Sequence, residues 1–271
     1  MRVLARLRAR RDTAYDNAYH HKLQGRLWGA LEDTQYDHLH DENRPKPFSF
    51  SNPFPPRDME EGDERTLLVA SPEEELLANI AADLKDEPEL NIGEMPFTVE
   101  GFTPLAPDVG EPGTSGTIDT GTGVLVRIPP WRFEEYGLDI DHDEAEFWRS
   151  EHTMEPFTNQ IEANLDKKHG LYCPDYLPGP SEVEGDLFDG YELLKTFAIP
   201  VEPATGRTET WVLSKWEFDY TVRDDDHRRH LNLALDVGVG ERNSLGFGFV
   251  NIIEKTGPSE TELEGKNAFA R

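Results

Sequence analysis

The sequence predicts an α+β protein made of two ferredoxin-like (RRM-like) βαββαβ domains in tandem, with a glycine-rich loop near its carboxyl end. The order strand, helix, strand, strand, helix, strand can be assigned twice along the chain. A segment rich in Gly, Pro, Ser and Thr, residues 106–123, separates the two series and is expected to be a linker or a long loop. The 271 residues are enough for two ordinary domains. We therefore expect domains at 1–118 and 122–255, followed by a flexible tail at 256–271.

In the first series, strands are expected at residues 2–9, 48–54, 65–71 and 97–105. The helix expected at 14–31 carries an apolar side chain at every fourth position on one face. The helix expected at 71–84 begins with a complete start signal. Ser71 can cap it, Pro72 suits the first helical position and Glu74 completes a capping box.

In the second series, strands are expected at residues 124–129, 191–202, 210–222 and 247–253. One helix is expected within 143–168. A second is expected at 224–237, where three aspartates at the start suit the positive end of the helix dipole. No residue-level similarity relates the two halves, so only the order of elements repeats.

The chain is strongly acidic, with 27 basic and 54 acidic side chains and a net charge of −27. An aromatic content of 10% and clear apolar runs still indicate a packed core. Acid excess with few lysines is typical of proteins from salt-loving organisms, where salt screens the self-repulsion of such a surface. The acidity therefore does not exclude a polyanionic partner. Residues 1–50 hold nine basic and seven acidic groups, a local excess of positive charge.

Compartment and metal content can also be predicted. The one cysteine, Cys173, excludes an internal disulfide and fits a reducing compartment. No apolar run approaches the ~18 residues that would span a membrane, and the amino end lacks the features of a signal peptide. We expect a cytoplasmic protein without a membrane partner. The spacing of His38 and His40, or of His227 and His230, would permit a metal ligand pair, but no cysteine pair or larger histidine cluster accompanies them. No metal is expected.

Near the carboxyl end, four glycines are spaced G-x-G-x5-G-x-G at Gly238, Gly240, Gly246 and Gly248. The order is helix, loop, strand, which is the reverse of a dinucleotide-binding fingerprint, and the P-loop pattern is absent. A nucleotide-binding enzyme is therefore disfavoured. Bare backbone can cradle an anion such as an RNA phosphate, and Arg242, Asn243 and Ser244, with Arg228 and Arg229 of the preceding helix, supply further donors. The alternative is a turn that allows close packing of helix and sheet.

Three segments together resemble one protein family. The loop "GVGERNSLGFGFV" (238–250) closely resembles the glycine-rich loop that ends the CRISPR repeat-processing endoribonucleases, the Cas six family of the RAMP superfamily. The segments "YHHKLQGRLWGAL" (19–31) and "LHDENRPKPFSFS" (39–51) resemble the first helix of that family and the segment after it. The resemblance covers both ends of the chain in the right order, while residues 55–190 add only a compatible order of elements.

The resemblance implies an activity. Members cut the CRISPR precursor transcript within each repeat without a metal or other cofactor. The 2′-hydroxyl beside the scissile phosphate attacks it, which leaves 2′,3′-cyclic phosphate and 5′-hydroxyl ends. The implied partner is CRISPR repeat RNA or the crRNA product, with a multi-subunit CRISPR effector complex as a further one. The alternative is a non-catalytic RAMP subunit that binds guide RNA within such a complex.

The resemblance also implies site residues. His40 matches the catalytic histidine of the family and Lys46 the lysine that follows it. Neutral imidazole can exchange a proton near neutral pH, and an ammonium can stabilise charge that develops on a phosphate. The alternatives are a loop histidine with structural hydrogen bonds and a solvated lysine. Arg26 on the first helix joins the candidate RNA contacts.

One position departs from the family pattern. Some members place a tyrosine on the first helix, where this chain has Trp28, and an indole N–H cannot act as a general acid or base. Trp28 is expected either in the core or stacked on a base. His21 shares its helix face, and Tyr36 or His38 are the candidates for the missing group.

Overall fold

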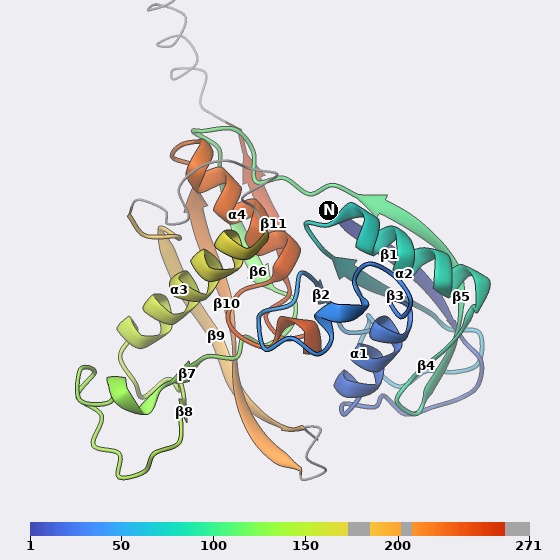
Figure 1. Ribbon diagram of the computed structural model, residues 1–271, viewed down its shortest axis with the longest axis horizontal. Coiled ribbons are helices and arrows are strands. Elements are labelled where there is room, and N and C mark those ends of the chain that lie inside the picture. The colour runs from blue at the N-terminus through green and yellow to red at the C-terminus, as the bar shows by residue number, and fades with distance from the viewer. Residues whose placement is uncertain (173–184, 202–207, 258–271) are drawn as a thin grey trace, which may run out of the picture.

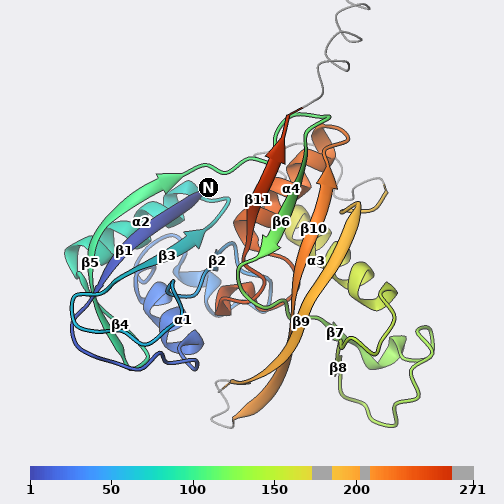
Figure 2. The ribbon, with the colours of Figure 1, turned by 180° about the vertical axis from the view of Figure 1, so that it is seen from behind.

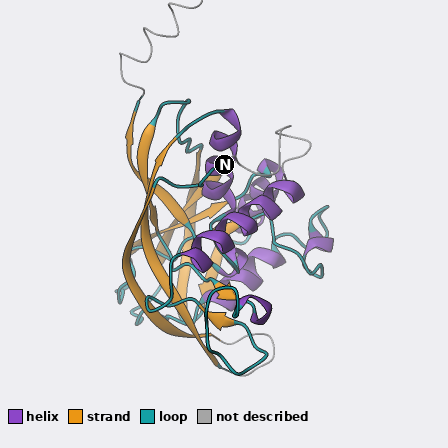
Figure 3. Cartoon of the chain, turned by 90° about the vertical axis from the view of Figure 1, so that its left-hand side faces the viewer, coloured by secondary structure: helices purple, strands orange, loops and turns teal. Residues whose placement is uncertain are grey.

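The computed structural model describes residues 1–172, 185–201 and 208–257. Two antiparallel sheets lie side by side (Figure 2), and the helices cover one face of each (Figure 1). Seen from the side, strands form one layer and helices the other (Figure 3). Among the described residues, no helix combines the length and apolar character that a membrane crossing requires.

The first sheet has the order β2-β3-β1-β5-β4. Strand β1 (Arg2–Ala9) lies at its centre, antiparallel to β3 (Glu64–Ala70) and β5 (Met95–Leu105). Strands β2 (Ser49–Phe50) and β4 (Glu89–Ile92) form the edges. Four of these strands, with the two helices between them, make the predicted ferredoxin-like unit. The sheet contains one further strand, β4, which pairs with β5 as a hairpin and which the sequence analysis did not predict.

The helices of this unit start later than predicted. Helix α1 (His20–Gly29) is followed by the short 3-10 helix η1 (Asp37–Leu39). Helix α2 is Glu74–Asp86. The predicted capping box is wrong, because Ser71 accepts a hydrogen bond from the Glu73 amide ahead of the helix and donates its hydroxyl to the Pro47 carbonyl.

The second sheet has the order β11-β6-β10-β9, again that of a ferredoxin-like unit. Its strands are β6 (Ser115–Thr120), β9 (Gly190–Val201), β10 (Glu209–Thr221) and β11 (Val250–Thr256). The prediction of a linker throughout 106–123 is wrong, because β6 pairs with both β10 and β11. Residues 115–118, which we expected in the first domain, thus belong to the second sheet.

Helices α3 (Glu155–Tyr172) and α4 (Asp225–Val237) cover this sheet. Between β6 and α3 a lobe projects that contains β7 (Arg127–Ile128), the 3-10 helix η2 (Pro130–Arg132) and β8 (Glu146–Phe147). Of the strand predicted at 124–129, only β7 forms. Cys173 and nearly all of the predicted tail, from residue 258, lie outside the described residues.

Each unit has its own apolar core between sheet and helices. Leu7, Leu67 and Phe97 from the first sheet pack with Leu27 and Ile80 from its helices. In the second unit, a corresponding core combines side chains of the sheet, α3 and α4, among them Phe157, Trp216, Phe218, Leu231 and Val250. Each helix thus buries its apolar stripe against one sheet face, which leaves its polar face for other roles.

Arg2 joins the two units through a buried guanidinium. Only 3% of the residue is exposed. Its Nη2 donates to the carbonyls of Leu235 at 2.7 Å and Val250 at 2.5 Å, and its Nη1 donates to Asn251 Oδ1 at 2.8 Å. The guanidinium also lies 4.6 Å from the centre of the Phe249 ring. The first strand of one unit is therefore fixed to the last helix and last strand of the other.

The glycine-rich loop, residues 238–248, packs against the first unit. It contains the 3-10 helix η3 (Asn243–Leu245). His20 of α1 lies between the rings of Tyr19 and Phe247, at 4.2 and 4.5 Å, and donates from Nδ1 to the Leu245 carbonyl at 2.8 Å. Burial lowers the pKa of His20 to about 4, so its ring is neutral at neutral pH.

Two of the loop glycines have no room for a side chain. Gly246 has a φ of +86° and Gly248 a φ of +65°. A Cβ at position 246 would collide with the ring of Phe50 on β2, and one at position 248 with the carbonyl oxygen of Val239. These two glycines therefore fit the alternative of a turn that permits close packing. Without a side chain, the loop backbone can lie directly against neighbouring atoms.

Replacing Arg2 with Met is expected to lower the free energy of unfolding by about 3 kcal/mol, because two buried carbonyls and the half-buried Asn251 side chain lose a charged donor. Chemical denaturation at fixed salt measures this. Arg6→Met is the matched control, since Arg6 lies exposed on the same strand. Equal stability of the two variants would contradict the role given to Arg2.

Gly248→Ala is expected to destabilise the protein by about 2 kcal/mol or more, because both the left-handed backbone and the Val239 carbonyl oppose a methyl group. Gly25→Ala is the control. Gly25 lies exposed within α1 with open space around it, so alanine there should leave stability unchanged or raise it by up to about 1 kcal/mol. Thermal unfolding of both variants measures the difference in stability. A Gly248→Ala protein as stable as the wild type would show that position 248 has room for a methyl group.

Candidate active site

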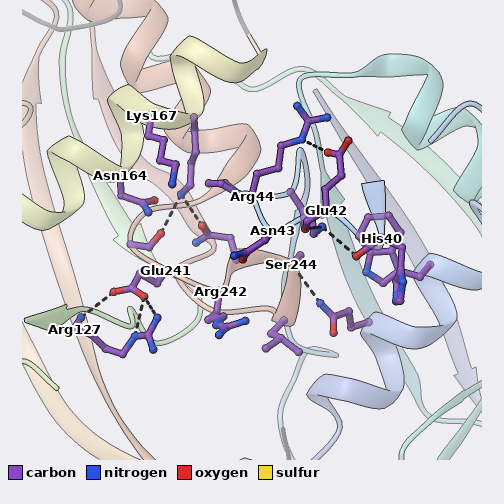
Figure 4. Close-up of a pocket in the computed structure, with 18 of the residues that line it drawn as sticks. His40, Glu42, Asn43, Arg44, Arg127, Asn164, Lys167, Glu241, Arg242 and Ser244 are labelled. Carbon is purple, nitrogen blue, oxygen red and sulfur yellow. Dashed lines mark hydrogen bonds and ion pairs between the residues drawn. The ribbon is translucent and has the colours of Figure 1, made fainter. Parts of the chain in front are cut away.

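A cleft of about 490 Å³ lies between the two units (Figure 4). One wall is formed by α1 and by residues 40–46, which follow η1. The other is formed by the glycine-rich loop and by α3, which contributes Asn164, Lys167 and Lys168. Segments from both ends of the chain and from its middle therefore share one site.

His40 lies at the edge of this cleft with an exposed side chain. Its Nδ1 is 3.0 Å from Asp41 Oδ1, and its ring stands edge-on to Trp28 at 5.4 Å. Because a carboxylate only accepts hydrogen bonds, Nδ1 is the donor, and Nε2 of the neutral ring is left as a proton acceptor. This is the arrangement expected of a histidine that exchanges protons with a substrate.

Trp28 packs against the His40 ring from the interior of the first unit. The residue is only 7% exposed, and its ring packs edge-on against Phe48 at 5.1 Å. The Lys46 ammonium lies 5.7 Å from the centre of the same ring. Of the two roles considered for Trp28, the structure places it in the core.

Lys46 holds the turn that carries His40. Its Nζ donates to the carbonyls of Leu39, of His40 at 3.2 Å and of Glu42 at 2.6 Å. Burial lowers the pKa of this ammonium below its usual value. Three carbonyls occupy its three hydrogens, so in this conformation the group acts on the turn.

The cleft is cationic in a protein that is otherwise acidic. Two acidic residues line it, Glu42 and Glu241, against six basic ones, Arg44, Lys46, Arg127, Lys167, Lys168 and Arg242. Both acids are engaged by arginines: Arg44 pairs with Glu42, and Arg127 Nε lies 2.8 Å from Glu241 Oε2. The net positive charge faces whatever enters the cleft, which suits a polyanion.

Arg242 and Ser244, two of the candidate RNA contacts, line the cleft from the glycine-rich loop. Arg242 is exposed and has a left-handed backbone, with a φ of +57°, which is uncommon for a residue with a side chain. Ser244 Oγ accepts a hydrogen bond from Gln24 of α1 at 3.2 Å. Asn243 differs. It is buried, and its Nδ2 donates to the carbonyls of Val239 and Phe247 within the loop.

Three of the predicted RNA-binding arginines lie outside the cleft. Each is held in an ion pair: Arg26 with Asp83 of α2, Arg228 with Asp108 and Glu111, and Arg229 with Asp226. Such pairing is common in a chain with twice as many acidic as basic side chains.

The other accessory candidates divide between two hollows. His21 lines the cleft, while His38 and Tyr36 line a separate hollow between the η1 region and the start of α2. His38 is exposed and 4.0 Å from Glu42, and Tyr36 is buried. Among the described residues, no group of three His, Cys, Asp or Glu side chains is placed to hold a metal ion.

Lys168 was missed by the sequence analysis. It is 2% exposed, and its Nζ donates to the carbonyls of Gly238 and Gly240, both at 3.0 Å, and to Asn243 Oδ1 at 2.6 Å. A signal was present, because Lys168 falls on the buried stripe of α3 formed by Ile161, Leu165 and Tyr172. A lysine at such a position needs buried partners.

The chain is similar to known CRISPR-associated proteins. The family model described as "CRISPR associated protein Cas6, C-terminal" matches residues 115–252. A CRISPR-associated endoribonuclease Cas6 from Haloferax mediterranei is 54% identical over the whole of both chains. CRISPR-associated endoribonuclease Cas6 2 from Methanocaldococcus jannaschii is 25% identical over 94% of this chain and all of its own.

The fold comparison points the same way. The solved structure of a Cas6-related gene product from Pyrococcus furiosus superposes with a TM-score of 0.67 at 17% sequence identity, covering 93% of this chain and 98% of its own. The tandem ferredoxin-like architecture is thus shared. Together with the identity over the full length of the Haloferax protein, it shows that the chain belongs to the Cas6 family of CRISPR-associated endoribonucleases.

Proposed function

We propose that this chain cuts CRISPR precursor RNA within its repeats, without a metal ion, by attack of a 2′-hydroxyl on the adjacent phosphate. The products carry 2′,3′-cyclic phosphate and 5′-hydroxyl ends. One observation carries the proposal: His40 and the glycine-rich loop, about 200 residues apart in sequence, line one cationic cleft. The names of the curated relatives, both endoribonucleases, support it.

The reaction needs a group that takes the proton of the 2′-hydroxyl and one that returns a proton to the leaving 5′-oxygen. In its neutral form His40 is suited to the first transfer, because its Nε2 is unprotonated and Asp41 accepts from the other nitrogen. Once Nε2 carries a proton, the imidazolium can donate it to the leaving 5′-oxygen. The ring stands on buried Trp28, which limits its motion. We assign proton transfer to His40.

The reaction also develops negative charge on the phosphate. Lys167 and Arg242 face the cleft from two elements of the second unit and are exposed, so they are the cations best placed to meet RNA. Lys46 supports the reaction by holding the turn of His40. Membership of a multi-subunit effector complex and a cytoplasmic location stay predictions.

His40→Ala is expected to slow cleavage of labelled repeat RNA by about 10²- to 10⁴-fold, the usual contribution of a general acid or base, with RNA affinity retained. The assay contains excess chelator and high salt. His38→Ala is the matched control, two residues away and outside the cleft, and should cut at the wild-type rate.

The two failures of this experiment differ in meaning. Intact repeat RNA after incubation with the unmutated protein would overturn the enzymatic proposal and favour an RNA-binding subunit. Unchanged cleavage by His40→Ala would overturn only the assignment of the proton-transfer residue.

Lys46→Met is expected to slow cleavage by about 10²-fold at saturating RNA, because the turn of His40 loses its hydrogen-bond donor and the imidazole moves from its working position. Faster amide hydrogen exchange at residues 39–42 should accompany the loss. Lys22→Met, an exposed change on α1, is the control. Slow cleavage with unchanged exchange would show instead that the ammonium acts on the phosphate.

A further inference from the structure

The ammonium of Lys168 is enclosed beneath the glycine-rich loop without an acidic partner. Its three contacts are two loop carbonyls and the amide oxygen of Asn243. Among the described residues, no carboxylate oxygen lies close enough to the Lys168 Nζ, within 4.0 Å, to form an ion pair with it. The charge of Glu241 acts on Lys168, and Arg127 donates to that carboxylate from both its side chain and its backbone amide. The ammonium therefore has no direct ion-pair partner, and the charge of Glu241 that acts on it is shared with Arg127.

Such a charge is costly to bury unless something offsets it. Burial lowers the pKa of Lys168 to about 7, so protonated and neutral forms coexist near neutral pH. The protonated form has three hydrogens for its three acceptors, whereas the neutral amine has two. Loss of the proton therefore leaves one loop acceptor without its donor, and the loop is held less firmly.

We propose that Lys168 is the positioning residue of the glycine-rich loop, and that one RNA phosphodiester bound on the cleft side of the loop completes the electrostatic balance of its buried ammonium. RNA binding and retention of the Lys168 proton are then coupled. The inference rests on the proposed function, in which RNA occupies the cleft, and goes beyond it by naming a buried group that senses the phosphate.

A phosphodiester suits this position for a physical reason. It carries a single negative charge that does not titrate near neutral pH. Of the phosphodiester and Lys168, only the lysine therefore gains or loses a proton in this range. A negative charge close to the loop raises the lysine pKa, and by linkage the proton raises the affinity for RNA. Affinity should then fall as the pH rises above the pKa of the free protein.

Other charged groups surround Lys168 and must be distinguished from it. The glycine-rich loop contributes Glu241 and Arg242, β7 contributes Arg127, and α3 contributes Lys167 and His169. The remaining charged groups of the cleft are those of residues 40–46. Burial lowers the pKa of His169 to about 4, so it stays neutral in the range of interest. The histidines of the cleft are His21 and His40.

The test uses the full chain with His40→Ala, which is expected to slow cleavage about 10²- to 10⁴-fold and removes one histidine from the cleft. The dissociation constant for intact repeat RNA is measured between about pH 7 and about pH 9 at constant salt. We expect it to rise by up to about tenfold per pH unit over part of this range. Adding Lys168→Met should weaken binding and flatten the pH profile. Adding Lys167→Met, the exposed neighbour, should weaken binding and leave the slope unchanged.

A flat profile in the His40→Ala protein, or a slope that survives Lys168→Met, would overturn the inference. If Lys168→Met does not fold, titration calorimetry of His40→Ala with RNA at about pH 8 in buffers of different ionisation enthalpy replaces it. Proton uptake on binding is expected, and its absence would contradict the coupling. RNA that binds at no pH would overturn the proposed function together with this inference.

Discussion

The structure depends on the close packing of one bare backbone segment, the glycine-rich loop, between its two units. Gly246 lies against Phe50 of the first sheet and Gly248 against the Val239 carbonyl of its own loop, so neither position has space for a side chain. His20 fixes the loop from α1 and Lys168 fixes it from α3. The site is built where these contacts meet, and Arg2 joins the same two units from another side.

Charge is distributed to serve that site. A net charge of −27 repels RNA at most of the surface, yet six basic residues line the cleft and its two acids are paired with arginines. Elsewhere arginines such as Arg26 and Arg228 are engaged by acidic neighbours. High salt screens long-range repulsion but acts less on partly buried groups, so a recessed cationic cleft suits an acidic protein. The full-length similarity to a Haloferax protein fits this salt-adapted surface.

The sequence predicted much of this arrangement, but not all. The repeated order of elements identified the fold, and β1 was predicted at its observed bounds. Strand β6 was missed because Gly, Ser and Thr also compose linkers, and only its pairing with β10 and β11 distinguishes it. The motif resemblance identified His40 and the loop as candidates, but that they line one cleft is known only from the structure. The buried role of Asn243 and the partners of Lys168 depend on tertiary packing between α3 and the loop, which local sequence does not reveal.

The central claim is that the His40 turn and the glycine-rich loop bind one RNA segment between them. The most direct measurement is a structure of the unmutated chain with repeat RNA whose nucleophilic 2′-hydroxyl is replaced by hydrogen, which prevents cleavage. We predict the scissile phosphate in the cleft, with His40 on one side and Arg242 and Ser244 on the other. RNA bound across the open faces of the sheets, with the cleft unoccupied, would contradict the claim.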